Sequence, residues 1–301
     1  MMKQFKGTAM LLLAAMIWGA AFTAQSVGME FVGPFTFQAA RQMLGCLILL
    51  PIIFLRDKAG SEPNRPKTKK DHLLLIGSGA LCGFILFCAC SLQQFGLLYT
   101  TPGKAGFLTA LYIIFVPIVG LFINRKAGFG LALSVILAAV GLYFLCMDGS
   151  LSLGKGELLN LLCALCFTAH ILFLDRISPK VDGVRLSSLQ FFFCSVFSIP
   201  CMLLTETVAV KDVLSCWLPI CYTGILSCGA GYTLQILAQK NTDPTIASIT
   251  MSMESVFAVV FGWILLGDAL GAKEIFGCVL MFAAIVLAQL PKGFLKKKER
   301  V

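Results

Sequence analysis

The chain has 301 residues, of which 58% are apolar and only 13% charged, and its mean hydropathy is +0.89. A soluble domain normally carries about 25% charged residues, so this composition excludes a soluble protein and predicts a helical membrane protein. The formal net charge is +9, but its basic residues lie in short loops and a tail. We therefore predict a lipid bilayer rather than nucleic acid as the chain's surroundings.

Ten apolar runs fill the chain in order, each long enough to cross a bilayer as a helix. The predicted helices span 8–27, 34–55, 72–98, 102–123, 128–147, 156–175, 185–204, 213–239, 245–266 and 273–290. The first run follows basic residues as a signal peptide does, but it is long and lacks a small-residue cleavage site, which favours a retained helix. The longest hydrophilic segments, 56–71 and 292–301, are too short to fold as soluble domains.

Thirteen cysteines lie mostly inside these runs, where cysteine behaves as a small packing residue. Cys163 and Cys166 form a C-x-x-C pair in mid-helix without a second pair, so helix packing is a better interpretation than a metal site. A GxxxxGK[ST] segment for ATP is also missing from the sequence. We therefore predict no metal, no cofactor and no catalytic residue. Any transport across the membrane is expected to be driven by ion or substrate gradients.

The basic residues divide unequally between the two sides of the predicted helices. Nineteen lysines and arginines fall at the N-terminus, in alternate loops and at the C-terminus, against four on the opposite side: Lys104, Lys155, Lys211 and Lys273. An excess of Lys and Arg marks the cytoplasmic side of a membrane protein. Both termini are therefore predicted to be cytoplasmic, in a multi-pass protein of the cell membrane.

The second half of the chain matches the first. At an offset of 149, Gly7 aligns with Gly156 and Pro51 with Pro200; at an offset of 142, Gln93 aligns with Gln235, Thr100 with Thr242, Pro102 with Pro244 and Gly120 with Gly262. The repeats are residues 1–149 and 150–301, each with five predicted helices. Because five is odd, the second repeat enters the membrane inverted. The predicted fold is all-α, with ten transmembrane helices in two inverted five-helix repeats, an architecture typical of secondary transporters.

Several short motifs occur in order through both repeats. They are Trp18-Gly19, TPGKAGFLT at 101–109, LYIIFVP at 111–117, PTIASI at 244–249, MESVFA at 253–258 and GWILLGD at 262–268, with Gly277 beyond. In these the chain resembles the EamA-type members of the drug/metabolite transporter superfamily over nearly its whole length. The resemblance implies a ten-helix carrier that exports amino acids, other metabolites or drugs. Asp268, Ser255 and Phe167 depart from the usual residues of that pattern. These departures argue against assigning the substrate of any particular family member to this chain.

Three ionisable residues lie well inside the predicted helices: Arg41, His170 and Glu254. Charge within a bilayer is expensive, so such residues are functional candidates. Burial among apolar neighbours favours the neutral form of a carboxyl such as Glu254, which could carry a proton or meet a cationic substrate. The alternative for each residue is a structural hydrogen bond between helices.

Further polar candidates are Gln38, which shares a helix face with Arg41 by its i, i+3 spacing, and the repeat-related pair Gln93 and Gln235. The aromatic candidates are Trp18, Phe22, Tyr112 and Phe167. The repeat pairs Trp18 with Phe167 and Tyr112 with Glu254. Helix packing is the alternative for all of them, and for aromatic residues it is the commoner one.

The preferred hypothesis is a secondary transporter, not an enzyme, that exports small amphipathic or zwitterionic metabolites by alternating access. Its substrate is expected to bind between the repeats, in a cavity touched by the first, third, fourth, sixth, eighth and ninth predicted helices. Protons are the candidate coupling ions, and a monomer or weak homodimer is expected. A membrane-embedded enzyme acting on a lipid-linked substrate is the alternative, and a passive channel is a weaker one.

Overall fold

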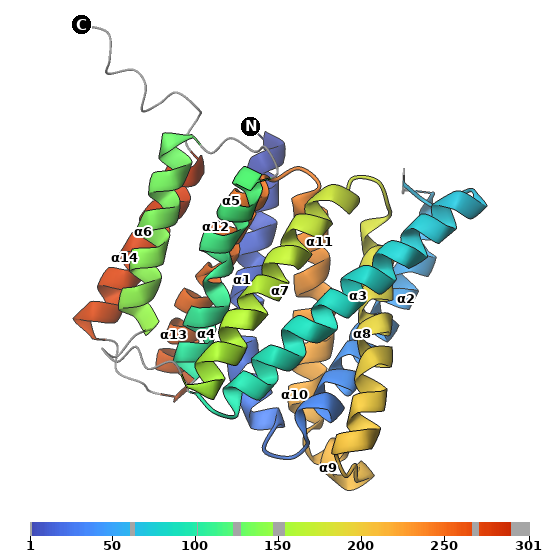
Figure 1. Ribbon diagram of the computed structural model, residues 1–301. Helices are drawn as coiled ribbons and strands as arrows, with labels where there is room; N and C mark the ends of the chain where they lie inside the picture. The colour runs from blue at the N-terminus through green and yellow to red at the C-terminus, as the bar shows by residue number, and fades with distance from the viewer. Residues whose placement is uncertain are drawn as a thin grey trace, which may run out of the picture.

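The computed structural model describes residues 2–60, 64–100, 102–122, 128–146, 154–266 and 271–289, and every regular element in these ranges is a helix (Figure 1). The helices of the first half are α1 (Met2–Gly28), α2 (Pro34–Ala59), α3 (Lys69–Leu97), α4 (Pro102–Ala110), α5 (Tyr112–Phe122) and α6 (Phe129–Cys146). The all-α prediction is confirmed for this part of the chain. The predicted repeat boundary at 149–150, the basic tail 292–301 and the Gly267-Asp268 pair lie outside the described residues.

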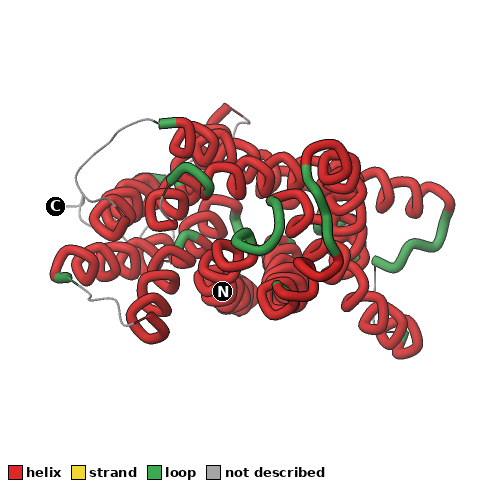
Figure 2. Tube along the Cα trace, turned by 90° about the horizontal axis from the view of Figure 1, so that it is seen from below, coloured by secondary structure: helices red, strands yellow, loops and turns green. Residues whose placement is uncertain are grey.

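The second half holds α7 (Lys155–Ile177), α8 (Gly183–Thr205), α9 (Val210–Ser215), α10 (Trp217–Cys221), the π-helix η1 (Tyr222–Tyr232), α11 (Thr233–Gln239), α12 (Pro244–Met251), α13 (Met253–Leu266) and α14 (Ala272–Gln289). Viewed from below, the molecule is a bundle of helices joined by short connections (Figure 2). Among the described residues, eight segments are long and apolar enough to cross a membrane, and α6 adds a shorter apolar helix. Within the described residues, each of the ten predicted ranges overlaps one or more helices.

Three of the predicted helices are interrupted. The range 102–123 divides into α4 and α5 at Leu111, and the range 245–266 divides into α12 and α13 at Ser252. At Leu111 the backbone changes to i→i+3 bonding, with Ile114 N donating to Leu111 O. At Ser252 the hydroxyl donates to Ile249 O at 2.8 Å, a bond of the kind that bends helices. Broken helices at corresponding positions of two repeats mark substrate sites in transporters.

The third interruption replaces most of the predicted helix 213–239 with four shorter elements, including η1. Its glycines allow two neighbouring helices to approach closely: a Cβ at Gly224 would lie 2.9 Å from Leu44 Cβ of α2, and one at Gly231 2.6 Å from Trp18 Nε1 of α1. A π-helix widens the turn and is frequent at functional sites. The element η1 therefore lies directly beside the two helices that carry Trp18 and Arg41.

The α2 and α8 helices pack along each other and are joined by a carboxylate at each end. At one end Arg185, near the start of α8, pairs with Asp57 near the end of α2. At the opposite end Glu206, directly after α8, accepts hydrogen bonds from Phe35 N at 2.8 Å and from Thr36 N at 2.8 Å at the start of α2. Asp57 and Glu206 are 149 residues apart, the same offset that aligns the first two predicted helices of the repeats.

A second pair of contacts follows both offsets. A Cβ on Gly7 of α1 would lie 3.4 Å from Ala238 O and would clash with Thr242 Oγ1. A Cβ on Gly156 of α7 would lie 3.0 Å from both Gly96 O and Thr100 Cβ. Gly7 and Gly156 differ by 149, whereas the partner residues differ by 142. The same close contact therefore occurs near the start of α1 in the first half of the chain and of α7 in the second.

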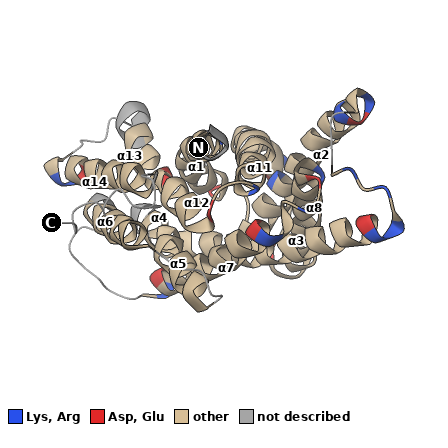
Figure 3. Cartoon of the chain, turned by 90° about the horizontal axis from the view of Figure 1, so that it is seen from above, with Lys and Arg blue, Asp and Glu red and all other residues tan. Residues whose placement is uncertain are grey.

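The two ends of the bundle differ in charge. Figure 3 looks down on the end that holds the N-terminus and shows Lys and Arg at the ends of α2 and α3 and along the connection between them. Lys155, Lys211 and Lys273 belong to the starts of α7, α9 and α14, which lie at the opposite end in Figure 1. The helix pair α6 and α14 lies at one side of the bundle, away from α2 and α8.

Candidate functional site

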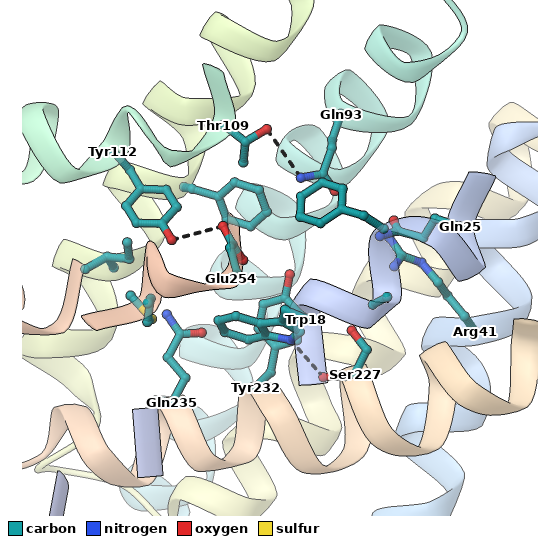
Figure 4. Close-up of a pocket in the computed structure, with 15 residues that line it drawn as sticks. Trp18, Gln25, Arg41, Gln93, Thr109, Tyr112, Ser227, Tyr232, Gln235 and Glu254 are labelled. Atoms are coloured by element: carbon teal, nitrogen blue, oxygen red, sulfur yellow. Dashed lines mark hydrogen bonds between the residues drawn. The ribbon is translucent and has the colours of Figure 1, made fainter. Parts of the chain in front are cut away.

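A cavity lies between helices of both halves, near the interruptions of α4–α5 and α12–α13 (Figure 4). Its lining combines polar groups and aromatic rings: Trp18, Ala21, Phe22, Gln25, Arg41, Gln93, Thr109, Tyr112, Phe167, Ile171, Ser227, Tyr232, Gln235, Met251 and Glu254. A concave space with a few convergent polar groups is the usual form of a small-molecule site.

The helices that line the cavity agree with the sequence-based expectation in most respects. Its residues come from the first, third, fourth, sixth, eighth and ninth predicted helices, as the repeat pairing indicates, and from the second through Arg41. The α6 and α14 helices contribute no lining residue in the described ranges. The second helix was not in the predicted set, and Arg41 brings a formal charge from it into the lining.

Glu254 lies in the first turn of α13 and is 6% exposed. Its Oε1 accepts a hydrogen bond from Tyr112 Oη at 3.1 Å, so the repeat-related pair meets at the cavity wall. No lysine or arginine of the described ranges forms an ion pair with this carboxyl. In the same turn Ser255 N donates to Ser252 O. The Glu254 carboxyl therefore lines the cavity with the Tyr112 hydroxyl as its partner and without a cation among the described residues.

Arg41 is 3% exposed and lies about two turns from the start of α2. Its Nε and Nη2 atoms have no hydrogen-bond partner, and its guanidinium carbon lies 5.7 Å from the centroid of the Phe37 ring. Within the described chain no carboxylate pairs with it. A buried and unpaired charge costs on the order of several kcal/mol. Arg41 lines the cavity, so an anion bound there would lower this cost.

The two predicted glutamines occupy different environments. Gln93 Nε2 donates to Thr109 Oγ1 at 3.4 Å, whereas Gln235 Oε1 is buried without a hydrogen-bond partner. Gln25, which also lines the cavity, likewise has an unpartnered Oε1. Buried polar atoms normally have partners, so the unpartnered acceptors indicate that water or a ligand completes these bonds.

Eight of the ten candidate residues from the sequence line the cavity, and Gln38 and His170 do not. Gln38 Nε2 donates to Ser198 Oγ at 3.1 Å, which ties α2 to α8. His170 Nε2 lies 3.0 Å from Gln190 Oε1 and joins α7 to α8. For these two residues the geometry fits the alternative of interhelical hydrogen bonding.

The cavity also includes residues that the sequence reasoning missed. Tyr232 packs its ring 4.8 Å from that of Trp18, and the Trp18 Nε1 donates to the Ser227 carbonyl at 3.2 Å. Gln25, Thr109, Ser227 and Tyr232 carried a usable signal, because each is a polar residue inside an apolar run. Ala21, Ile171 and Met251 carried none, since apolar residues are the background of every membrane helix.

Comparison with known proteins identifies the family. The model of the EamA-like transporter family matches residues 5–147 and 154–290. The chain belongs to this family. The EamA resemblance of the sequence motifs is thereby confirmed. The chain is a multi-pass membrane protein. Membership of a transporter family implies a small-molecule substrate.

Known relatives are named as transporters, and a solved structure shares the fold of the chain. An uncharacterized transporter of Archaeoglobus fulgidus is 28% identical over 93% of this chain and 84% of its own length. The uncharacterized transporter YoaV of Bacillus subtilis is 22% identical over 92% of this chain and 94% of its own. A crystal structure with 16% identity superposes with a TM-score of 0.78 over 97% of this chain and 99% of that one, a likeness that shows the fold alone.

Proposed function

We propose that this EamA-family protein is a secondary transporter that exports small metabolites, such as amino acids and related amphipathic compounds, or drugs, by alternating access. The observation that carries the proposal is the cavity itself, which is lined by residues of both matched segments and holds a cation, an acid and unpartnered amides. Rocking of one half against the other would open this cavity to each side in turn.

The proposed architecture is ten transmembrane helices in two inverted repeats, residues 1–149 and 150–301. Three observations support it. The helices of both halves are interrupted near Leu111 and Ser252, the carboxylates of Asp57 and Glu206 join α2 and α8 at opposite ends, and the glycine contacts of α1 and α7 correspond. An inverted repeat relates each of these pairs by one pseudo-two-fold axis.

The proposed orientation in the cell membrane places both termini in the cytoplasm. Fusing a phosphatase that is active only outside the cytoplasm after Val301 is expected to give an inactive fusion, because the basic residues of the chain gather on the side of the termini. Phosphatase activity of cells that express the fusion is the measurement. A fusion in the α2–α3 connection should also be inactive, and one in the α8–α9 connection active. Strong activity after Val301 would contradict both the orientation and the inversion.

The paired glutamines give a second test within the cavity. Replacing both Gln93 and Gln235 by leucine is expected to leave the protein inserted and to reduce transport by roughly tenfold, more than either single change, because a shared ligand loses polar partners from two helices. Substrate flux in proteoliposomes is the measurement. The matched control is Gln38→Leu, which removes an amide outside the cavity. Wild-type flux in the double variant would mean that the amides only pack helices.

The function itself is tested by reconstitution. The purified protein in proteoliposomes is expected to catalyse counterflow of at least one compound from a panel of amino acids, organic acids and amines. Glu254→Gln and Arg41→Gln proteins in the same vesicles provide comparisons from the cavity. Counterflow distinguishes a carrier from a channel, because a channel does not accumulate labelled substrate against its gradient. Absence of flux across the panel, with hydrolysis of lipid-linked substrates instead, would favour the membrane-embedded enzyme.

A further inference from the structure

The charges of the cavity are arranged asymmetrically. Figure 4 shows Arg41 at one side of the cavity and Glu254 with Tyr112 at the other, with the Trp18 ring drawn below Glu254 in this view. We propose, building on the transport function above, that the substrate is a bipolar molecule whose carboxylate pairs with Arg41. At its other end an ammonium group reaches Glu254, and an apolar body separates the two.

The anionic end is argued from Arg41. The unpartnered Nε and Nη2 atoms form one edge of the guanidinium, and this edge matches a carboxylate through two parallel hydrogen bonds. The groups around Arg41 offer no substitute anion: they include the Phe37 ring and the thiols of Cys90 and Cys228. Both thiols also contact the neighbouring Gln42. A protein that keeps a buried guanidinium without a resident anion leaves that partner to the ligand.

The cationic end is argued from the opposite wall. Glu254 supplies a carboxyl and Gln235 an unpartnered carbonyl oxygen, and both are acceptors. The Tyr112 hydroxyl donates its hydrogen bond to Glu254 Oε1. The second carboxyl oxygen of Glu254 is therefore the one that can accept a hydrogen bond from the ligand. Acceptors without a resident cation fit an ammonium group, which has three donors and no acceptor.

The apolar middle is argued from the rings. Trp18 and Tyr232 lie with centroids 4.8 Å apart and planes tilted by 55°, and Phe22 and Phe167 complete the aromatic lining. Aromatic walls favour a flat or aliphatic body by area burial and offset contact. The electron-rich faces of these rings disfavour an anion between them, so the carboxylate belongs to the Arg41 end.

The test measures binding separately from transport. The probes share one ring: 4-(aminomethyl)benzoate has both ends, 4-methylbenzoate only the anion, 4-methylbenzylamine only the cation, and L-phenylalanine both charges on one carbon. Ligand-induced thermal stabilisation of the full-length protein in detergent gives the affinities. We expect 4-(aminomethyl)benzoate to bind most tightly. Arg41→Gln should weaken it by about tenfold to hundredfold, the range for a lost hydrogen bond to a charged group, while binding of 4-methylbenzylamine is unchanged.

Two further variants keep the test decisive. Arg41→Lys retains the charge without the two-donor edge and should weaken 4-(aminomethyl)benzoate to an intermediate level, so it serves if the glutamine variant fails to fold. Arg176→Gln removes an exposed guanidinium at the end of α7 and should bind every probe as the wild type does. A phosphonate analogue that binds more tightly than the benzoate would overturn the assignment of a carboxylate.

The remaining outcomes separate this inference from the transport proposal. Equal affinity for 4-methylbenzylamine and 4-(aminomethyl)benzoate, tighter binding of L-phenylalanine, or no binding of any carboxylate probe would overturn the bipolar ligand. Wild-type affinity in the Arg41→Gln and Arg41→Lys proteins would do the same. Tight Arg41-dependent binding with no counterflow of that probe in proteoliposomes would sustain the ligand class and count against transport instead.

Discussion

Replacing Glu254 with glutamine is expected to remove the pH dependence of transport and to weaken binding of bipolar substrates, while leaving substrate exchange in place at saturating substrate. Glutamine keeps the shape of the side chain and still accepts the hydrogen bond from Tyr112, but it cannot take up or release a proton. Intramembrane carboxyls commonly serve as proton relays in transporters. If Glu254 couples transport to protons, net flux driven by a pH gradient should fall by roughly tenfold or more, whereas exchange without a gradient persists.

The measurement is initial flux in proteoliposomes between about pH 5.5 and about pH 8, the range in which a buried carboxyl can change its charge. Glu30→Gln is the matched control, since it makes the same chemical change at an exposed position after α1. Tyr112→Phe should keep a pH-dependent flux, because the titrating group remains. Because Glu254 is also proposed to meet the ammonium group of the substrate, affinity for cationic substrates should fall in the Glu254→Gln protein, whereas affinity for neutral ones should not change. Unchanged flux and substrate preference would leave Glu254 a structural hydrogen bond.

The helical ranges were predictable because apolar length and hydropathy alone determine where a chain can cross a bilayer. The interruptions at Leu111 and Ser252 were not predictable in the same way. At Ser252 a hydroxyl bonds to the Ile249 carbonyl, but serine also occurs in unbroken membrane helices. The π-helix η1 depends on close contacts of its glycines with Leu44 and Trp18, which are distant in sequence. The local pattern of apolar residues therefore predicts where a helix begins and ends, but not where it is interrupted or becomes a π-helix.

The candidate site was predictable where a residue type is costly in a membrane. Arg41 and Glu254 were found on this ground, and both line the cavity. Gln38 and His170 met the same criterion, yet their bonds go to Ser198 and Gln190 of α8. A polar side chain satisfies its hydrogen bonds with whichever helix packs against it, and the sequence of one helix does not identify that neighbour. Tyr232 illustrates the converse case, since its ring reaches the cavity through contact with Trp18.

A single methyl group at Gly19 is expected to reduce transport strongly. Gly19 follows Trp18 in α1, and a Cβ there would lie 2.7 Å from Phe257 Cβ, 2.8 Å from Ala258 N and 2.8 Å from Glu254 O of α13. Two of these atoms are backbone, so the clash is relieved only if α1 and α13 move apart. Overpacking of this kind costs about 1–3 kcal/mol. The movement would displace Trp18 and Phe22 relative to the Glu254 carboxyl.

Gly19→Ala is therefore expected to lower the thermal stability of the purified protein and to decrease flux by roughly tenfold, the factor that corresponds to about 1.4 kcal/mol lost from the competent conformation. Gly77→Ala in α3 is the matched control, because nothing lies within 4 Å of its added Cβ. That control should gain about 0.5–1 kcal/mol of stability, since alanine favours a helix over glycine, with flux unchanged. The two alanines should thus shift stability in opposite directions. A Gly19→Ala protein as stable and active as the Gly77→Ala protein would show that α1 and α13 tolerate wider spacing and that the geometry around Glu254 does not depend on their close contact.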